Sequence, residues 1–192
     1  MKQFIKPILV LRTLVTAGVG LCLITLNSQP AFSANKVKLI YGPFNGKISV
    51  DSLEKFAATG EMTREFRLYS KFVDRETLAQ MRYWLSNRFE CDRVAMYKFT
   101  NSSEGEEFLQ DLGTVIKTHP QRNGLYAIRS ALIAAADEPS NSDGWTVIEA
   151  MQNFPTEDLQ INTKQLFKLQ KFWSDNNSNQ AALEIFAPQT EK

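Results

Sequence analysis

Two side chains in this sequence could carry nucleophilic or proton-transfer chemistry, a histidine and a cysteine. His119, in the segment KTHPQRNG, is the only histidine, and imidazole is the commonest proton shuttle near neutral pH. Cys91 could pair with it as a nucleophile beside a base. Each also has a structural explanation, because His119 precedes Pro120 at the expected end of a helix and a free cysteine is more often a small buried hydrophobe. We therefore predict no catalytic residue and keep His119 as a candidate polar site, for a ligand or for structure.

Acidic side chains gather in two places, and each group has a chemical and a structural interpretation. Glu104, Glu106 and Glu107 could supply the paired carboxylates that hydrolyse a glycosidic bond, but they also fall in the first turn of an expected helix, where negative charge is favourable. The segment DEPSNSDG, residues 137–144, does not match the spacing of a calcium loop and is typical of an interhelical loop. One histidine and one cysteine at distant positions cannot supply the usual zinc ligands. We predict no metal and no cofactor.

Arg129 is the one charged residue in an otherwise apolar segment, NGLYAIRSALIAAA, residues 123–136. Such a segment predicts a helix in the middle of the fold. A charge there must reach water or find a partner. We expect Arg129 to form a structural ion pair, with a ligand contact as the alternative.

The elements that must position these residues begin with a β-hairpin. Val37–Tyr41 and Ile48–Val50 are β-prone runs separated by a turn rich in glycine and proline. Asp51 is expected to cap the following helix, with Glu54 reaching back, and Gly60 to end it.

Capping residues and apolar spacing predict that the rest of the chain is mostly helical. The segment LQIN, residues 159–162, alternates apolar and polar residues and predicts a third strand beside the hairpin. The predicted fold class is mainly α (α+β), a compact helical domain over residues 35–175 with a small two- or three-stranded antiparallel sheet. Residues 176–192 are expected to be a weakly structured tail. The expected helices are 63–73, 74–88, a short one from Asp92, 102 or 103 to about 120, 123–136, 142 or 143 to 154, and one from Thr163.

The N-terminal residues predict export. Three basic residues precede an apolar run, Leu14–Leu26, and the small residues around Ser33 and Ala34 offer a cleavage site, so residues 1–33 are interpreted as a signal peptide. An uncleaved anchor is the alternative. Of the 22 basic residues three lie in this leader, so 19 remain against 21 acidic residues. We predict a periplasmic or extracellular domain with no stable membrane span after cleavage and no electrostatic footprint for nucleic acid.

Three segments carry a family resemblance: YGPFNGKISVDSLEKFAATGE, NGLYAIRSALIAAA and VIEAMQNFPTEDLQIN. Their order and spacing resemble the cyanobacterial domain of unknown function 1400 over about residues 36–165. The resemblance implies a domain that commonly stands before an α/β-hydrolase-like region in exported proteins. This chain ends at residue 192 and carries no G-x-S-x-G elbow, so we expect the hydrolase part to be missing. No position matches a catalytic residue that the resemblance could supply.

We therefore predict a non-catalytic binding or accessory module, which covers a hydrolase's active site, presents its substrate or contacts another envelope protein. An exposed groove formed by Phe66, Tyr69, Phe72 and Trp84 would favour an acyl-type ligand or a protein, whereas the simpler interpretation is that these aromatics fill the core. The alternatives are a small ester or glycan hydrolase in its own right, and the remnant of a longer α/β-hydrolase.

Overall fold

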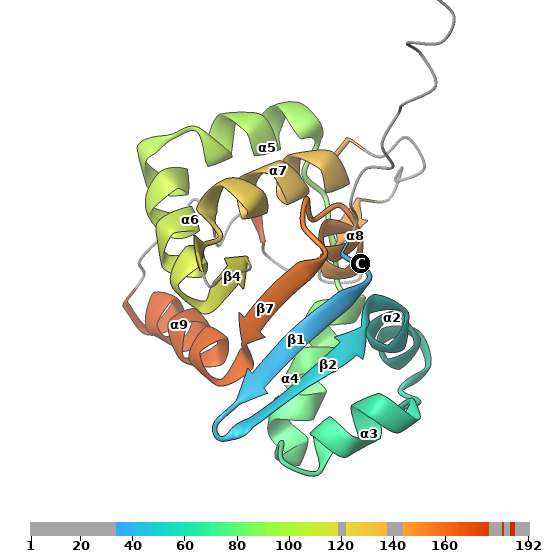
Figure 1. The fold of residues 1–192 in the computed structure, drawn as a ribbon. Coiled ribbons are helices and arrows are strands. Elements are labelled where there is room, and N and C mark those ends of the chain that lie inside the picture. Colours follow the sequence, from blue (N-terminus) through green and yellow to red (C-terminus); the bar gives the residue numbers. More distant parts are fainter. Residues whose placement is uncertain (1–33, 119–121, 138–143, 177–181, 183–184, 187–192) are drawn as a thin grey trace, which may run out of the picture. The chain divides into compact units, whose positions relative to one another are not determined.

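The computed structural model describes residues 34–118, 122–137, 144–176, 182 and 185–186. The predicted signal peptide, His119 and most of the predicted tail lie outside these residues. Figure 1 shows the described part as a mixed sheet with helices packed behind it and at its two sides.

The main sheet has five strands in the order β2-β1-β7-β4-β5. The hairpin of β1 and β2 is confirmed, whereas β7 runs parallel to β1 and antiparallel to β4. The prediction of a small antiparallel sheet is therefore wrong in both size and direction. The predicted third strand does lie beside the hairpin, but a connection of more than a hundred residues brings it back in the parallel direction. The strands are β1 (Lys36–Tyr41), β2 (Phe44–Ser49), β7 (Asp158–Asn162), β4 (Ile116–Thr118) and β5 (Arg122–Asn123).

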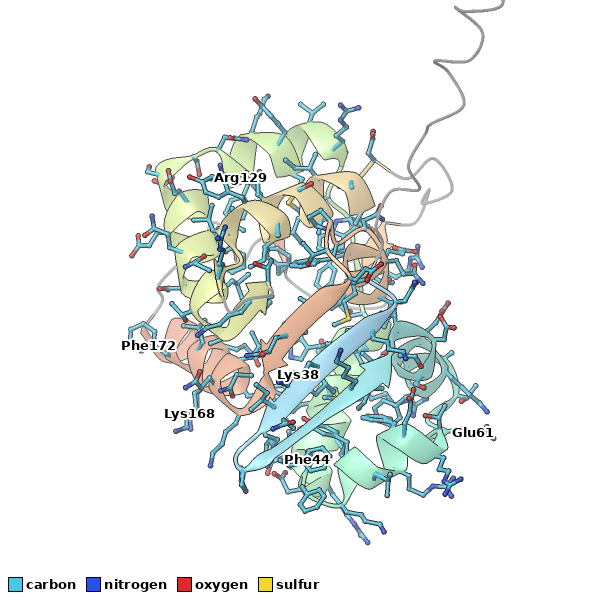
Figure 2. The ribbon with its side chains drawn as sticks, in the orientation of Figure 1. Lys38, Phe44, Glu61, Arg129, Lys168 and Phe172 are labelled. Carbon is cyan, nitrogen blue, oxygen red and sulfur yellow. The ribbon has the colours of Figure 1, made fainter. Side chains whose placement is uncertain are left out.

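The two faces of the sheet carry different side chains, apolar on one and polar on the other. Val37 pairs with Leu159 and Leu39 with Ile161, and all four side chains are buried on the inner face. Lys38, one position along, lies on the opposite face, which Figure 2 shows turned toward the viewer. The core therefore lies on one side of the sheet, where α4 (Arg75–Ser86), α7 (Leu125–Ala135) and α8 (Val147–Gln152) pack (Figure 1).

Helix starts in the first half follow local capping chemistry. Side chains of Thr63, Asp74 and Asp92 cap α3 (Arg64–Ser70), α4 and α5 (Arg93–Thr100), as their positions predicted. The cap of α2 (Val50–Thr59) is Ser49 and not Asp51, because the strand passes directly into the helix. Gly60 ends α2 with a φ of 75°, a conformation that glycine adopts without a side-chain clash.

The second half departs further from prediction. Ser102 caps α6 (Ser103–Val115) as expected, but the helix ends early because β4 starts at the next residue. Ser142 and Asp143 lie outside the described residues, and α8 starts at a capping box of Thr146 and Glu149. Just before it, β6 (Trp145–Thr146) pairs with β3 (Arg88–Phe89) in a second, two-stranded sheet. The last long helix is α9 (Thr163–Asn176).

Candidate functional site

An apolar cavity of about 270 Å³ lies between the inner face of the sheet and the helices. Leu39, Ile116 and Ile161 line it from β1, β4 and β7. Helices α4, α6, α7, α8 and α9 supply most of the remaining wall, so both halves of the chain build it. An apolar cavity of about 150 Å³ is large enough to hold benzene, so this one has room for a ligand of roughly ten carbon atoms.

A cluster of aromatic side chains forms one part of the cavity wall. The ring centroids of Phe89 and Trp145 lie 4.9 Å apart, and those of Phe108 and Phe186 lie 5.2 Å apart. Trp145 and Phe186 meet edge to face at 5.8 Å. Trp84 also lines the cavity and is only half-buried, so the lining reaches the surface there.

Polar groups in the lining are few. The Thr163 hydroxyl donates a 3.0 Å hydrogen bond to the carbonyl of Ile40 and accepts one of 2.7 Å from Tyr69, whose pKa burial raises to about 12. Gln170 is half-buried on α9. The indole Nε1 of Trp145 is buried and has no hydrogen-bond acceptor among the described residues. No charged side chain from the part of the chain that the structure describes lines the cavity.

The chemically capable residues of the sequence lie elsewhere. Burial, and then the charge of Asp92, raise the pKa of the Cys91 thiol, so the group stays in its poorly nucleophilic form. Glu104 and Glu106 are exposed in the first turn of α6, where hydrogen bonds lower the pKa of Glu104, and Glu107 is exposed just after that turn. None of these four residues lines the cavity.

Arg129 lies on α7, away from the sheet in Figure 2. It is half-buried, and its guanidinium carbon lies 5.8 Å from the centre of the Tyr126 ring. Its Nε is buried with no acceptor, and no carboxylate pairs with it, among the residues that the structure describes. The expected ion pair is thus replaced here by a cation–π contact, and a ligand-binding role for Arg129 stays a prediction.

The four aromatics proposed as a groove do not form one surface. Phe66 and Tyr69 are fully buried in the core, whereas Phe72 is 55% exposed and stacks on Phe44 at 4.5 Å. Only Trp84 belongs to the cavity. The sequence does not predict the cavity, because within each helix or strand the residues that line it have the same pattern as ordinary core residues.

A family model described as "Alpha/beta hydrolase of unknown function (DUF1400)" matches residues 33–162. The chain belongs to this family. No curated protein and no solved structure matches it.

The DUF1400 domain also has a polar cluster at the starts of α2 and α3, which sequence analysis did not predict. The Glu65 carboxylate accepts hydrogen bonds of 2.5 Å from the hydroxyls of Ser49 and Ser52 and one of 3.0 Å from the Ser49 amide. The Ser52 hydroxyl also lies 2.9 Å from that of Thr63. These bonds lower the pKa of Glu65. Glu65 is the base of this set, and its lowered pKa makes it a weak acceptor for a serine proton, so we interpret the cluster as a structural link between two capped helix ends.

Three further features of this DUF1400 domain concern metal ions, membrane spans and a hydrolase motif. Within the described ranges, no group of histidine, cysteine, aspartate and glutamate is arranged to hold a metal ion. None of the helices in these ranges combines the length and the hydropathy that a bilayer-spanning segment requires. The full sequence carries no G-x-S-x-G motif.

Proposed function

We propose that this domain is a non-catalytic binding module that takes a small, acyl-type apolar ligand into the cavity behind its sheet. The observation that carries the proposal is the cavity itself, which is partly open to the surface, concave and apolar, as small-molecule sites usually are. Its lining of aliphatic and aromatic side chains suits a hydrocarbon chain, and the described residues of this lining include no charged partner for an ionic ligand.

A binding role is favoured over catalysis by where the reactive groups lie. The cavity wall presents no carboxylate, imidazole or thiol from the described residues, and Cys91 lies outside that wall with a raised pKa. A ligand in the cavity would therefore be held without a nucleophile or general base beside it.

The proposal also concerns the setting in which the domain works. Membership of an α/β-hydrolase family and the signal-like N-terminus support an exported module that presents an acyl ligand to a hydrolase or to another envelope protein. The partner would supply the nucleophile and the general base that the described residues do not place in the cavity wall.

The test is a titration of the full chain with the neutral apolar dye N-phenyl-1-naphthylamine, followed by fluorescence. Ala150 lines the cavity from α8, so Ala150→Leu should fill part of it and weaken dye binding by about tenfold without lowering the melting temperature. Ala58 is exposed on α2, so Ala58→Leu is the matched control and should leave dye binding unchanged. Dye binding that is absent in the unmodified chain, or insensitive to Ala150→Leu, would refute the proposal.

A further inference from the structure

The outer face of the main sheet, on the side away from the cavity, is basic. Strand pairing places Lys38 on β1 directly opposite Lys47 on β2, and Gln160 on β7 lies between Lys38 and Lys117 on β4. Residues paired in this way point to the same face, so one row across the sheet carries three lysines and no acidic residue. Lys38 stands on this face in Figure 2, and no described helix covers the face in Figure 1.

Helix α9 continues the positive charge beside the sheet. It follows β7 without a break and contacts β1. Its three lysines are all exposed and recur at intervals of four and three residues, so they form one stripe along the helix: Lys164, Lys168 and Lys171. The residues of α9 that line the cavity lie on another side of the helix. Together with the three lysines of the row, this stripe forms the basic face.

Ion pairs within the described chain do not neutralise the basic face. Lys38, Lys117 and the three lysines of α9 form no ion pair with the described residues. Lys36 also points outward from β1, but it interacts with the charge of Glu65 and is not counted in the basic face. Five lysines of the basic face are therefore available to an external anion.

The sequence around the basic face concentrates positive charge. Aspartate and glutamate are absent from the three segments that carry its six lysines, which are residues 35–50, 112–123 and 159–174. The near-neutral net charge of the chain therefore conceals a separation of charge between this face and the other elements. Like charges directly opposite each other in a sheet are unfavourable, so an anion bound between Lys38 and Lys47 would relieve their repulsion.

The chemistry of the basic face favours a lipid surface over nucleic acid. Its charges are all lysines, and an ammonium group is a point charge that suits a fluid layer of headgroups, whereas the arginine fork suits fixed phosphates. Phe172 follows Lys171 on α9 and is 55% exposed (Figure 2). Exposed aromatic and basic side chains on one helix are typical of helices that lie at a membrane interface.

We propose that the basic face docks this domain on the surface of a bilayer rich in anionic lipids. Lys38 and Leu39 are neighbours on β1 and point to opposite faces of the sheet, and Leu39 lines the cavity. A domain docked in this way keeps its cavity on the side of the sheet away from the lipid. The inference stands on the charges of the outer face and does not depend on what the cavity binds.

The experiment measures co-flotation of the full chain with vesicles of equal parts phosphatidylcholine and phosphatidylglycerol, and with vesicles of phosphatidylcholine alone. Binding should require the anionic lipid and weaken with salt, because the screening length falls from about 10 Å at 0.1 M to about 3 Å at 1 M. Lys38→Gln, Lys117→Gln and Lys168→Gln should each weaken binding about fivefold. Lys98→Gln is the matched control, since it removes the same charge from an exposed position on α5, and it should leave binding within about twofold.

A second readout locates the contact within the chain. Bicelles of the same anionic composition that carry a nitroxide on the headgroup should broaden the amide resonances of Lys38 and Gln160 more than that of Lys98. Melting temperatures check that the variants fold, and Lys38→Gln should not lower the melting temperature because it removes a like charge opposite Lys47.

Three results would overturn the docking proposal and leave the cavity proposal standing. One is equal binding of Lys38→Gln and Lys98→Gln to anionic vesicles. Another is broadening at Lys98 as strong as that at Lys38. The third is binding of a DNA duplex with no binding to either kind of vesicle, which would assign the basic face to nucleic acid.

Discussion

The hydroxyl of Tyr69 on α3 lies 2.7 Å from the hydroxyl of Thr163 at the start of α9, 94 residues further along the chain. Thr163 donates its own proton to the Ile40 carbonyl on β1, so Tyr69 is the donor of the shared bond. This relay joins an N-terminal helix, the central hairpin and the last long helix beside the cavity.

The relay predicts unequal costs for removing its two members. Tyr69→Phe should lower the free energy of unfolding by about 1 kcal/mol, because Thr163 keeps its bond to Ile40. Thr163→Val should cost about 2 kcal/mol or more, because it leaves the buried Tyr69 hydroxyl without its acceptor and also removes the bond to the Ile40 carbonyl. Urea unfolding of both variants measures the difference, and equal costs would contradict the relay.

We predict that the Glu65 carboxylate stabilises the folded state and that this stabilisation is lost in acid. Hydrogen bonds from Ser49 and Ser52 hold its pKa below the ordinary value of 4.5, so the folded state binds the proton less readily than the unfolded state. The stabilisation is therefore complete above about pH 4.5 and is lost as pH falls through the lower folded-state pKa. Glu65→Gln should be less stable at neutral pH and lose less stability on acidification.

A matched control for Glu65 is Glu61, whose 3.0 Å ion pair with Lys55 is exposed. Surface pairs of this kind contribute little, so Glu61→Gln should keep the acid dependence of the unmodified chain. Urea unfolding at a series of pH values compares the two variants. An acid dependence in Glu65→Gln as steep as that in Glu61→Gln would count against the hydroxyl–carboxylate cluster.

Two glycines with positive φ should respond differently to alanine. A Cβ at Gly144 would lie 2.4 Å from the Phe89 carbonyl oxygen, whereas a Cβ at Gly42 would have nothing within 4 Å. Gly42→Ala should cost about 1 kcal/mol from backbone strain alone, and Gly144→Ala about 3 kcal/mol or more. Thermal and urea unfolding measure these costs, and a Gly144→Ala protein as stable as Gly42→Ala would show that β3 and β6 do not pack this closely.

We expect the Cys91 thiol to react slowly in the folded chain. Because burial raises the pKa of its thiol, labelling by a disulfide reagent at mildly alkaline pH should be slow in the folded chain and fast after unfolding. The unmodified chain, Cys91→Ala and His119→Ala should all fail to hydrolyse aryl esters or cell-wall glycans. Hydrolysis by the unmodified chain that either substitution abolishes would favour a hydrolase over a binding module.

Local chemistry explains which parts of the fold were predictable. Thr63, Asp74, Asp92 and Ser102 each cap a helix through a bond to the residue three positions on, so the sequence around each contains the needed information. The hairpin was predictable for the same reason, since its turn and both strands are adjacent.

Long-range pairing explains what escaped prediction. Ile116–Thr118 follows α6 without a break and becomes a strand through pairing with β7, more than forty residues away. Trp145 likewise lies in a strand because it pairs with Phe89. Propensity within such two- or three-residue segments is too weak to set their structure, and tertiary contacts decide it. The cavity depends on the same long-range arrangement, so no single segment indicated it.

The most direct test of the central claim is to locate a bound ligand by NMR. Methyl octanoate labelled with carbon-13 should show nuclear Overhauser contacts to Leu132 on α7 and Ile161 on β7, which are buried in the cavity wall. Contacts confined to exposed apolar residues such as Leu68 and Phe72, with none to Leu132 or Ile161, would contradict a binding module built around this cavity.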